Sequence, residues 1–129
     1  MKTTGATISQ AADALDLTAD TLRYYERDNL LLRTVPREPN GHRRYQEADL
    51  HWIELITRLR ATGMPIRDIR QYAALVRAGD GNETERLELL RRHRRRVLAQ
   101  LAAVTVNLAA IDHKIALYDD RLEQRALSA

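Results

Sequence analysis

Residues 21–27 read Thr-Leu-Arg-Tyr-Tyr-Glu-Arg, and this stretch is the most informative part of the chain. At the α-helical period, Leu22 and Tyr25 fall on one face, which can pack on a domain. The opposite face carries Asp20, Arg23, Tyr24 and Arg27. Because arginine and tyrosine on a free helix face suit a DNA groove, the stretch predicts a recognition helix. Tyr25 lies beside Leu22 and is expected to pack in the core.

The chain before this stretch predicts the first half of a helix-turn-helix motif. A first helix is indicated by apolar side chains that recur at helical spacing, at Ile8, Ala11, Ala12 and Leu15. Ser9 is placed to cap this helix, and a second helix is expected to begin near Thr18. Asp16 falls between the two helices, where aspartate tolerates the left-handed conformation of a tight turn. Residues 1–6 are polar and are expected to be loose.

A hairpin is predicted after the recognition helix. Residues 33–45 contain Pro36 and Pro39, which oppose helix, and Asn40-Gly41, which favours a tight turn. They predict a short irregular hairpin, called the wing below. The wing carries Arg37, His42, Arg43, Arg44 and Tyr45. Since Glu38 is the only nearby acid in the sequence, the tip of the wing is expected to be distinctly positive.

Two more helices are predicted to complete the domain. Apolar residues recur at helical spacing over residues 47–62, and Gly63 is a natural stop. Pro65 suits the first turn of the next helix, which ends at Gly79-Asp80-Gly81. The sequence therefore predicts a mainly α fold, with a winged helix-turn-helix domain over residues 1–80 and a dimerisation helix and tail over residues 81–129.

The last segment, from Thr84 to about Arg121, contains no proline or glycine and predicts one long helix. Its apolar residues alternate in steps of three and four, which is typical of a coiled coil. This apolar seam runs through Leu87, Leu90, Val97, Leu101, Val104, Leu108, Ile111, Ile115, Tyr118 and Leu122, and only Arg94 interrupts it. Because no second helix of this length exists in the chain, we expect a homodimer through residues 84–122. Spacing alone leaves parallel and antiparallel pairing open.

Composition narrows the classes of function. The 129 residues carry a net charge of +3, and arginine far outnumbers lysine, which suits contacts with phosphate or guanine. No cysteine is present, so disulfides and thiolate metal ligands are excluded. Neither a metal-binding cluster nor a set of catalytic residues is visible, so we expect no enzyme activity, cofactor or metal. No apolar run or signal peptide predicts a membrane segment, so a cytoplasmic protein is expected.

Several motifs together resemble the MerR family of bacterial transcriptional regulators. They are, in order, residues 21–26, Leu30 to Leu32, Gly41-His42-Arg43-Arg44-Tyr45 and Leu59-Arg60-Ala61-Thr62-Gly63-Met64. The resemblance implies a winged helix-turn-helix domain and a long helix paired antiparallel with its twin. It also implies binding to double-stranded promoter DNA, where the dimer bends and untwists a long spacer for RNA polymerase.

The resemblance also assigns the DNA-binding residues. Arg23 and Tyr24 are expected to contact DNA from the recognition helix, with Thr21 beside them and Arg27 as a phosphate contact. The wing is expected to contribute His42, Arg43, Arg44 and Tyr45, mostly at phosphates.

Within the family, the short tail resembles the members that respond to aldehydes and other electrophiles. Those members carry a cysteine where this chain has Arg58, so a covalent thiol sensor is ruled out. The effector is unknown, and a pocket for a small molecule is expected near Trp52, Tyr72 or Tyr118.

Two other functions stay open from the sequence. One is an architectural DNA-bending or recombination-accessory protein with the same winged fold, and the other is an interaction module whose long helix recruits a partner.

The arginine-rich run at residues 91–96 is interpreted as a mainly solvated or interface segment, with a second nucleic-acid patch as the alternative.

Overall fold

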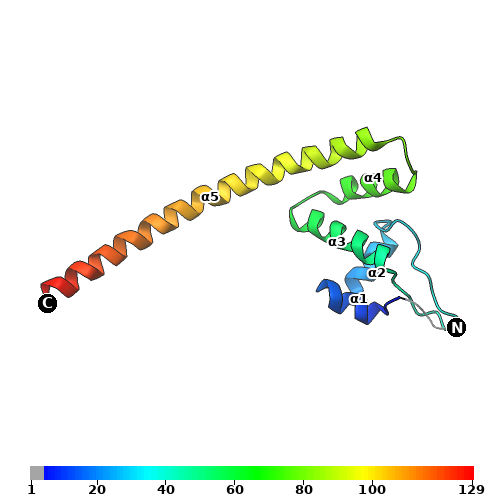
Figure 1. Cartoon of the computed structure of the whole chain (residues 1–129), viewed down its shortest axis with the longest axis horizontal. Helices are drawn as coiled ribbons and strands as arrows, with labels where there is room; N and C mark the ends of the chain where they lie inside the picture. The colour runs from blue at the N-terminus through cyan, green and yellow to red at the C-terminus, as the bar shows by residue number, and fades with distance from the viewer. Residues whose placement is uncertain (1–4) are drawn as a thin grey trace. The chain divides into compact units, whose positions relative to one another are not determined.

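The computed structural model describes residues 5–129, and this part of the chain forms five helices (Figure 1). They are α1 (Ile8–Leu15), α2 (Ala19–Arg27), α3 (Glu47–Ala61), α4 (Ile66–Arg77) and α5 (Glu83–Ser128). The mainly α prediction is confirmed. The chain divides into two compact units, Met1–Leu90 and Arg91–Ala129. The first turns of α5 belong to the first unit, because Leu89 is buried and Leu90 packs against its core.

The start of the chain differs from the prediction in two ways. Ala6 is not loose, because it forms an antiparallel bridge with Tyr45 at the end of the wing, whereas residues 1–4 of the expected loose segment lie outside the described residues. The cap of α1 is Thr7 and not Ser9. The Thr7 hydroxyl accepts the Gln10 amide at 3.1 Å, and the Gln10 side chain accepts the Thr7 amide at 2.9 Å. This capping box places the helix cap two residues earlier than expected.

The helix-turn-helix forms as predicted. Asp16 ends α1 with φ 55° and ψ 46°, the left-handed conformation that a tight turn requires. Thr18 caps α2 by accepting the Thr21 amide at 3.1 Å. Leu22 and Tyr25 are both buried, and the Tyr25 hydroxyl lies 3.3 Å from Thr57 Oγ1 on α3. The apolar face of the recognition helix therefore holds α2 on the domain, as expected.

The loop between α2 and the wing is held by side chains from α3 and α4. The Trp52 indole donates to the Leu30 carbonyl at 2.7 Å, and Arg77 donates to the Leu31 carbonyl at the same distance. Arg70 on α4 forms an ion pair with Asp28 at 3.0 Å. These bonds satisfy backbone carbonyls where α2 ends, and they fix the direction in which the chain leaves the recognition helix.

The wing is an irregular hairpin, as predicted. Arg37 and Arg43 face each other in an antiparallel bridge, and the Gly41 amide closes the turn on the Glu38 carbonyl at 2.8 Å. At the base of the wing, Arg33 donates to both oxygens of Asp49 on α3, at 3.0 and 2.8 Å. Burial raises the pKa of Asp49, but the hydrogen bonds from Arg33 and from the backbone of Gln46 outweigh it and bring that pKa below its ordinary value.

The core of the first unit is made mainly of branched aliphatic side chains from α2, the loop after it, the wing, α3 and α4. Its largest fully buried members are Leu22, Tyr25, Leu30, Val35, Tyr45, Ile53, Ile56 and Ile69. Gly63, with φ 91°, makes the turn between α3 and α4. Pro65 stands just before α4 as its cap and not within the first turn, because Ile66 is the first helical residue.

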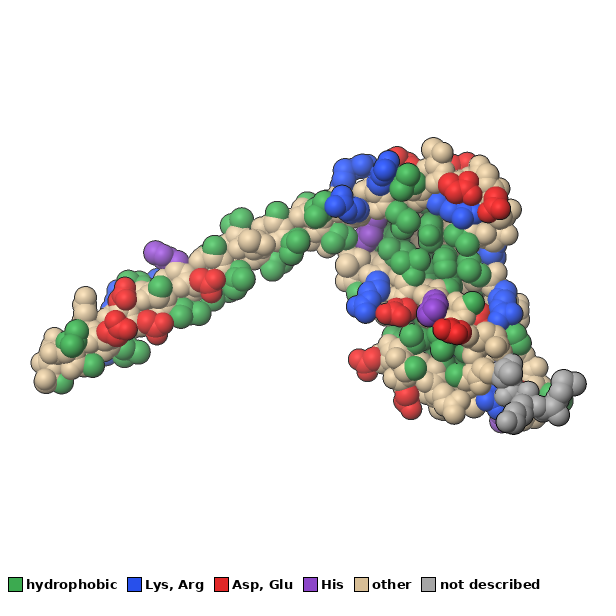
Figure 2. Space-filling model, viewed as in Figure 1, with side chains coloured by type: hydrophobic (Ala, Val, Ile, Leu, Met, Phe, Trp, Pro, Cys, Tyr) green, Lys and Arg blue, Asp and Glu red, His purple; other side chains and the backbone are tan. Residues whose placement is uncertain are grey.

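The second unit consists of helix α5 alone, and its apolar seam is open to solvent. The seven seam residues from Leu101 to Leu122 are between 52% and 62% exposed. Figure 2 shows the apolar side chains spaced along this helix. Five arginines at its start, Arg91, Arg92, Arg94, Arg95 and Arg96, are also exposed. Exposing such a row of apolar side chains to water is unfavourable in free energy, so the seam is expected to pack against a partner surface.

Helix α5 is also long and apolar enough to cross a membrane by length and composition, with a mean hydropathy of 1.2 in its most apolar window. This corrects the expectation that no apolar run reaches that length. A membrane span is apolar around its whole circumference, whereas α5 carries Asn107, Asp112 and Lys114 within the same stretch. Most of its large apolar residues follow the seam, which favours a coiled coil.

Candidate nucleic-acid interface

The polar face of α2 is accessible. The Arg23 side chain is 47% exposed, and its guanidinium lies 2.8 Å from the Asp20 carboxylate one turn earlier. Arg27 is exposed at the end of the helix. The Thr21 hydroxyl lies 2.9 Å from Thr18 Oγ1, so it is already engaged at the helix cap. Arg23 and Arg27 are therefore accessible to a groove, with Arg23 paired to Asp20, whereas Thr21 stabilises the start of the helix.

Tyr24 is half-buried between two guanidinium groups. Arg27 lies 5.9 Å from the centre of the Tyr24 ring, and Arg60 on α3 lies 5.3 Å from it. Arg60 also lies 5.7 Å from the Tyr25 ring. Such cation–π contacts fix a tyrosine and bring a third positive charge beside the recognition helix. The sequence did not point to Arg60 as a neighbour of Tyr24, because the contact joins two helices far apart in the chain.

The arginines of the wing are held by carboxylates. Glu26 on α2 lies 3.0 Å from Arg37 and 3.3 Å from Arg43, and Glu38 lies 2.5 Å from Arg44. The prediction that Glu38 is the only acid near the tip, and that the tip is therefore distinctly positive, is wrong because a second acid, Glu26, lies beside the wing. The fold brings Glu26 against the wing and neutralises part of its charge. His42 is exposed at the tip.

Tyr45 does not belong to the interface. The residue is only 1% exposed, and its buried hydroxyl has no hydrogen-bond partner among residues 5–129. The prediction that Tyr45 contacts DNA is therefore wrong, because the Ala6 bridge and the core cover the ring. Burial raises the pKa of Tyr45, and the positive charges of the nearby arginines oppose that rise only in part.

Replacing Tyr45 with phenylalanine tests this assignment. The change keeps the buried ring and removes a hydroxyl that has no partner in the described part of the chain, so we expect the free energy of unfolding to rise by about 1 kcal/mol. Operator affinity should stay unchanged. Thermal denaturation and a gel-shift titration measure the two quantities. A marked loss of affinity in a folded Tyr45→Phe protein would show that the Tyr45 hydroxyl does contact DNA.

A pocket of about 410 Å³ brings most of the remaining candidates together. It lies between the start of α1, the recognition helix and the wing. Its polar lining includes Thr7, Ser9, Arg23, Glu38, His42, Arg43 and Arg44. Three arginines and one glutamate therefore line a pocket beside the amino-terminal end of α1, and the excess of positive charge suits a phosphate of the DNA backbone. Thr21, Tyr24 and Arg27 do not line this pocket.

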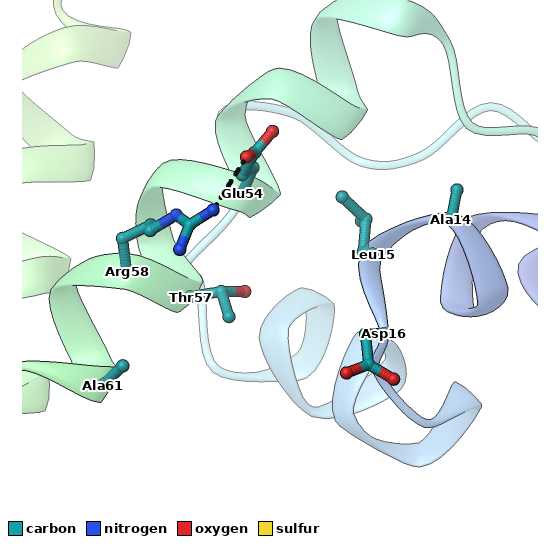
Figure 3. A pocket seen from close by; sticks show the side chains of 7 residues that line it. All are labelled: Ala14, Leu15, Asp16, Glu54, Thr57, Arg58 and Ala61. Carbon is teal, nitrogen blue, oxygen red and sulfur yellow. Dashed lines mark hydrogen bonds and ion pairs between the residues drawn. The ribbon is translucent and has the colours of Figure 1, made fainter.

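A second pocket, of about 440 Å³, lies between the end of α1 and α3 (Figure 3). Arg58 lines it, at the position where the electrophile-responsive members have a cysteine, and it lies 3.4 Å from Glu54. The Thr57 hydroxyl donates to the Ile53 carbonyl. These pairings occupy polar groups that could otherwise orient a ligand.

The aromatic residues that were expected to line an effector pocket do not enclose a pocket of the size of a small-molecule site. Trp52 and Tyr72 stack on each other, with ring centres 5.6 Å apart. The pocket beside Trp52 measures about 160 Å³, which is below the usual size of a small-molecule site. Tyr118 lies on the exposed seam of the second unit.

The helix-turn-helix, the wing and the converging arginines define a winged-helix DNA-binding protein. Comparison with protein families agrees with this class. The model of the MerR HTH family regulatory protein matches residues 6–75, and the model of the MerR DNA-binding region matches residues 50–114. The chain therefore belongs to the MerR family of transcriptional regulators.

Relatives and solved structures support this assignment. A Haemophilus influenzae protein described as an uncharacterized HTH-type transcriptional regulator is 35% identical, covering 87% of this chain and 82% of that protein. AdhR of Bacillus subtilis is 40% identical over 70% of this chain and 64% of its own length. The crystal structure of HiNmlR, a MerR family regulator lacking the sensor domain and bound to promoter DNA, matches with a TM-score of 0.80. The match has 33% identity and covers 91% of this chain and 92% of HiNmlR.

Proposed function

We propose that this regulator binds a pseudo-palindromic promoter as a homodimer and controls transcription by bending and untwisting the spacer DNA. The observation that carries the proposal is the combination of one DNA-binding surface per chain with a solvent-exposed apolar seam on α5. Two copies joined through the seam present two recognition helices, as a two-fold symmetric operator requires. RNA polymerase is the proposed partner at the promoter, and the cytoplasm is the proposed location.

The spacing of the seam supports an antiparallel dimer in one register. When Leu108 lies opposite Ile111 of the partner subunit, every seam position from Val97 to Leu122 meets an apolar residue. Val104 then faces Ile115 of the partner subunit, and Leu101 faces Tyr118 of the partner subunit. A shift by one heptad in either direction leaves part of this seam without an apolar partner. In the proposed register no apolar seam residue from Val97 to Leu122 faces a charged one, whereas a shift by one heptad places Arg94 or Arg125 against this part of the seam.

Disulfide cross-linking tests this arrangement cleanly, because the chain has no cysteine of its own. We expect Val104→Cys and Ile115→Cys chains to form a covalent dimer when they are mixed, and little when either is oxidised alone. Ile115→Cys should not cross-link with Leu122→Cys, which serves as the matched control on the same seam. Non-reducing gel electrophoresis reads the result. Efficient cross-linking of Val104→Cys with itself would indicate a parallel dimer and overturn the proposal.

Transcription in vitro separates this function from that of an architectural DNA-bending or recombination-accessory protein. On the promoter recovered by selection of bound genomic fragments, a regulator changes the initiation rate of RNA polymerase. An accessory protein bends the same DNA without that change. Family membership favours the regulator.

A further inference from the structure

The carboxylate of Glu26 contacts both sides of the wing. Its Oε1 accepts a hydrogen bond from Arg37 Nη2 at 3.0 Å, and its Oε2 accepts one from Arg43 Nε at 3.3 Å. Arg37 and Arg43 face each other across the hairpin, so one side chain on α2 ties together the outgoing and the returning segments. The Glu26 side chain is only 16% exposed, and that of Arg43 is 20% exposed. This three-residue contact is the direct polar link between the recognition helix and the wing.

A negative charge at this place opposes DNA binding. Glu26 precedes Arg27 and lies one turn after Arg23, and it pairs with Arg43, which lines the pocket of about 410 Å³ between α1, the recognition helix and the wing. By Coulomb attraction alone, removing this carboxylate should strengthen binding to any polyanion. A positioning role explains why an acid can serve a DNA-binding surface, because an ion pair holds long, flexible arginine side chains in one place.

We propose that Glu26 is a positioning residue that fixes the wing guanidinium groups relative to the recognition helix, and that it thereby sets the discrimination between the operator and other DNA. The proposal rests on the function proposed above, in which the wing contacts phosphates.

Two physical effects act in the same direction. At the operator, phosphates meet arginines that are already ordered, so less side-chain entropy is lost on binding. At unrelated DNA, whose backbone does not match the fixed arrangement, the arginines must leave Glu26 before they reach a phosphate. The carboxylate therefore favours operator binding and disfavours non-specific binding.

The test measures the affinity of the full-length chain for two duplexes, the selected operator and a scrambled duplex of the same length and composition. For Glu26→Gln, we expect operator affinity to fall about tenfold, in line with the freedom regained by two arginines. Affinity for the scrambled duplex should rise about threefold, because one negative charge is lost. The ratio of the two affinities thus falls about thirtyfold. Glu47→Gln makes the same charge change at an α3 side chain that is 88% exposed, and its ratio should stay unchanged.

A double-mutant cycle isolates the positioning role. In an Arg37→Ala and Arg43→Ala background, Glu26→Gln should no longer change the ratio, since the groups it positions are gone. Circular dichroism verifies folding. If Glu26→Gln does not fold, Glu26→Asp takes its place, because it keeps the charge but cannot reach both arginines.

The outcomes are distinct. Equal changes in affinity for both duplexes, or an undiminished effect of Glu26→Gln in the arginine-free background, would overturn the positioning role. A wild-type chain that binds the operator no better than the scrambled duplex would instead contradict the proposed function itself.

Discussion

A chain carrying Leu108→Glu and Ile111→Glu is expected to be monomeric and to bind the operator about 10² to 10⁴ times more weakly than the wild type. In the proposed register these positions meet at the centre of the dimer, so the two substitutions would bring four carboxylates together in place of an apolar layer. Each monomer then binds only half a site, and the gain from joining two sites is lost. Analytical ultracentrifugation measures the first effect and gel-shift titration the second.

The matched control for this experiment carries Val106→Glu and His113→Glu. These positions lie two helical turns apart on the side of α5 opposite the seam, and the substitutions add the same formal charge. The control should remain dimeric and keep most of its affinity. If both double variants dissociate alike, the exposed seam is not the dimer contact.

Arg23→Ala is expected to weaken operator binding by about 1 to 3 kcal/mol. Arg23 is a half-exposed arginine that lies on the recognition face and also lines the pocket between α1, the recognition helix and the wing. Arg23→Lys should recover only part of the loss, because lysine cannot make a bidentate contact. Titration against the operator and a scrambled duplex shows whether the lost contact is to a base or to a phosphate.

Arg67→Ala provides the control for Arg23→Ala, since it removes the same charge from an α4 side chain that is 84% exposed. Its affinity should change by much less than 1 kcal/mol. If the Arg23→Ala protein is folded and dimeric and its operator affinity is unchanged, Arg23 does not contact the operator.

Local signals in the sequence predicted most of the fold. The helical period placed Leu22 and Tyr25 in the core, and the need for a left-handed residue placed the turn at Asp16. Both signals can be recognised within a short stretch of the sequence. The same holds for the extent of α5, which lacks a proline or glycine to end it.

Errors arose where distant parts of the chain meet. Tyr45 follows two arginines and looked like part of the same charged surface, but pairing with Ala6 turns its ring into the core. Glu26 showed no sign of its role, because the arginines that it holds are 11 and 17 positions further along the chain. Local patterns do not specify such pairings, since they depend on how the wing packs against α2.

Trp52 gives the protein a built-in optical probe. It is the only tryptophan in the chain, and it stacks on Tyr72 while its indole N–H is bonded to the Leu30 carbonyl. An indole in this position senses the local polarity and hydrogen bonding of the loop that follows the recognition helix. Its intrinsic fluorescence therefore reports, without any added label, on whether that loop rearranges when the protein binds DNA.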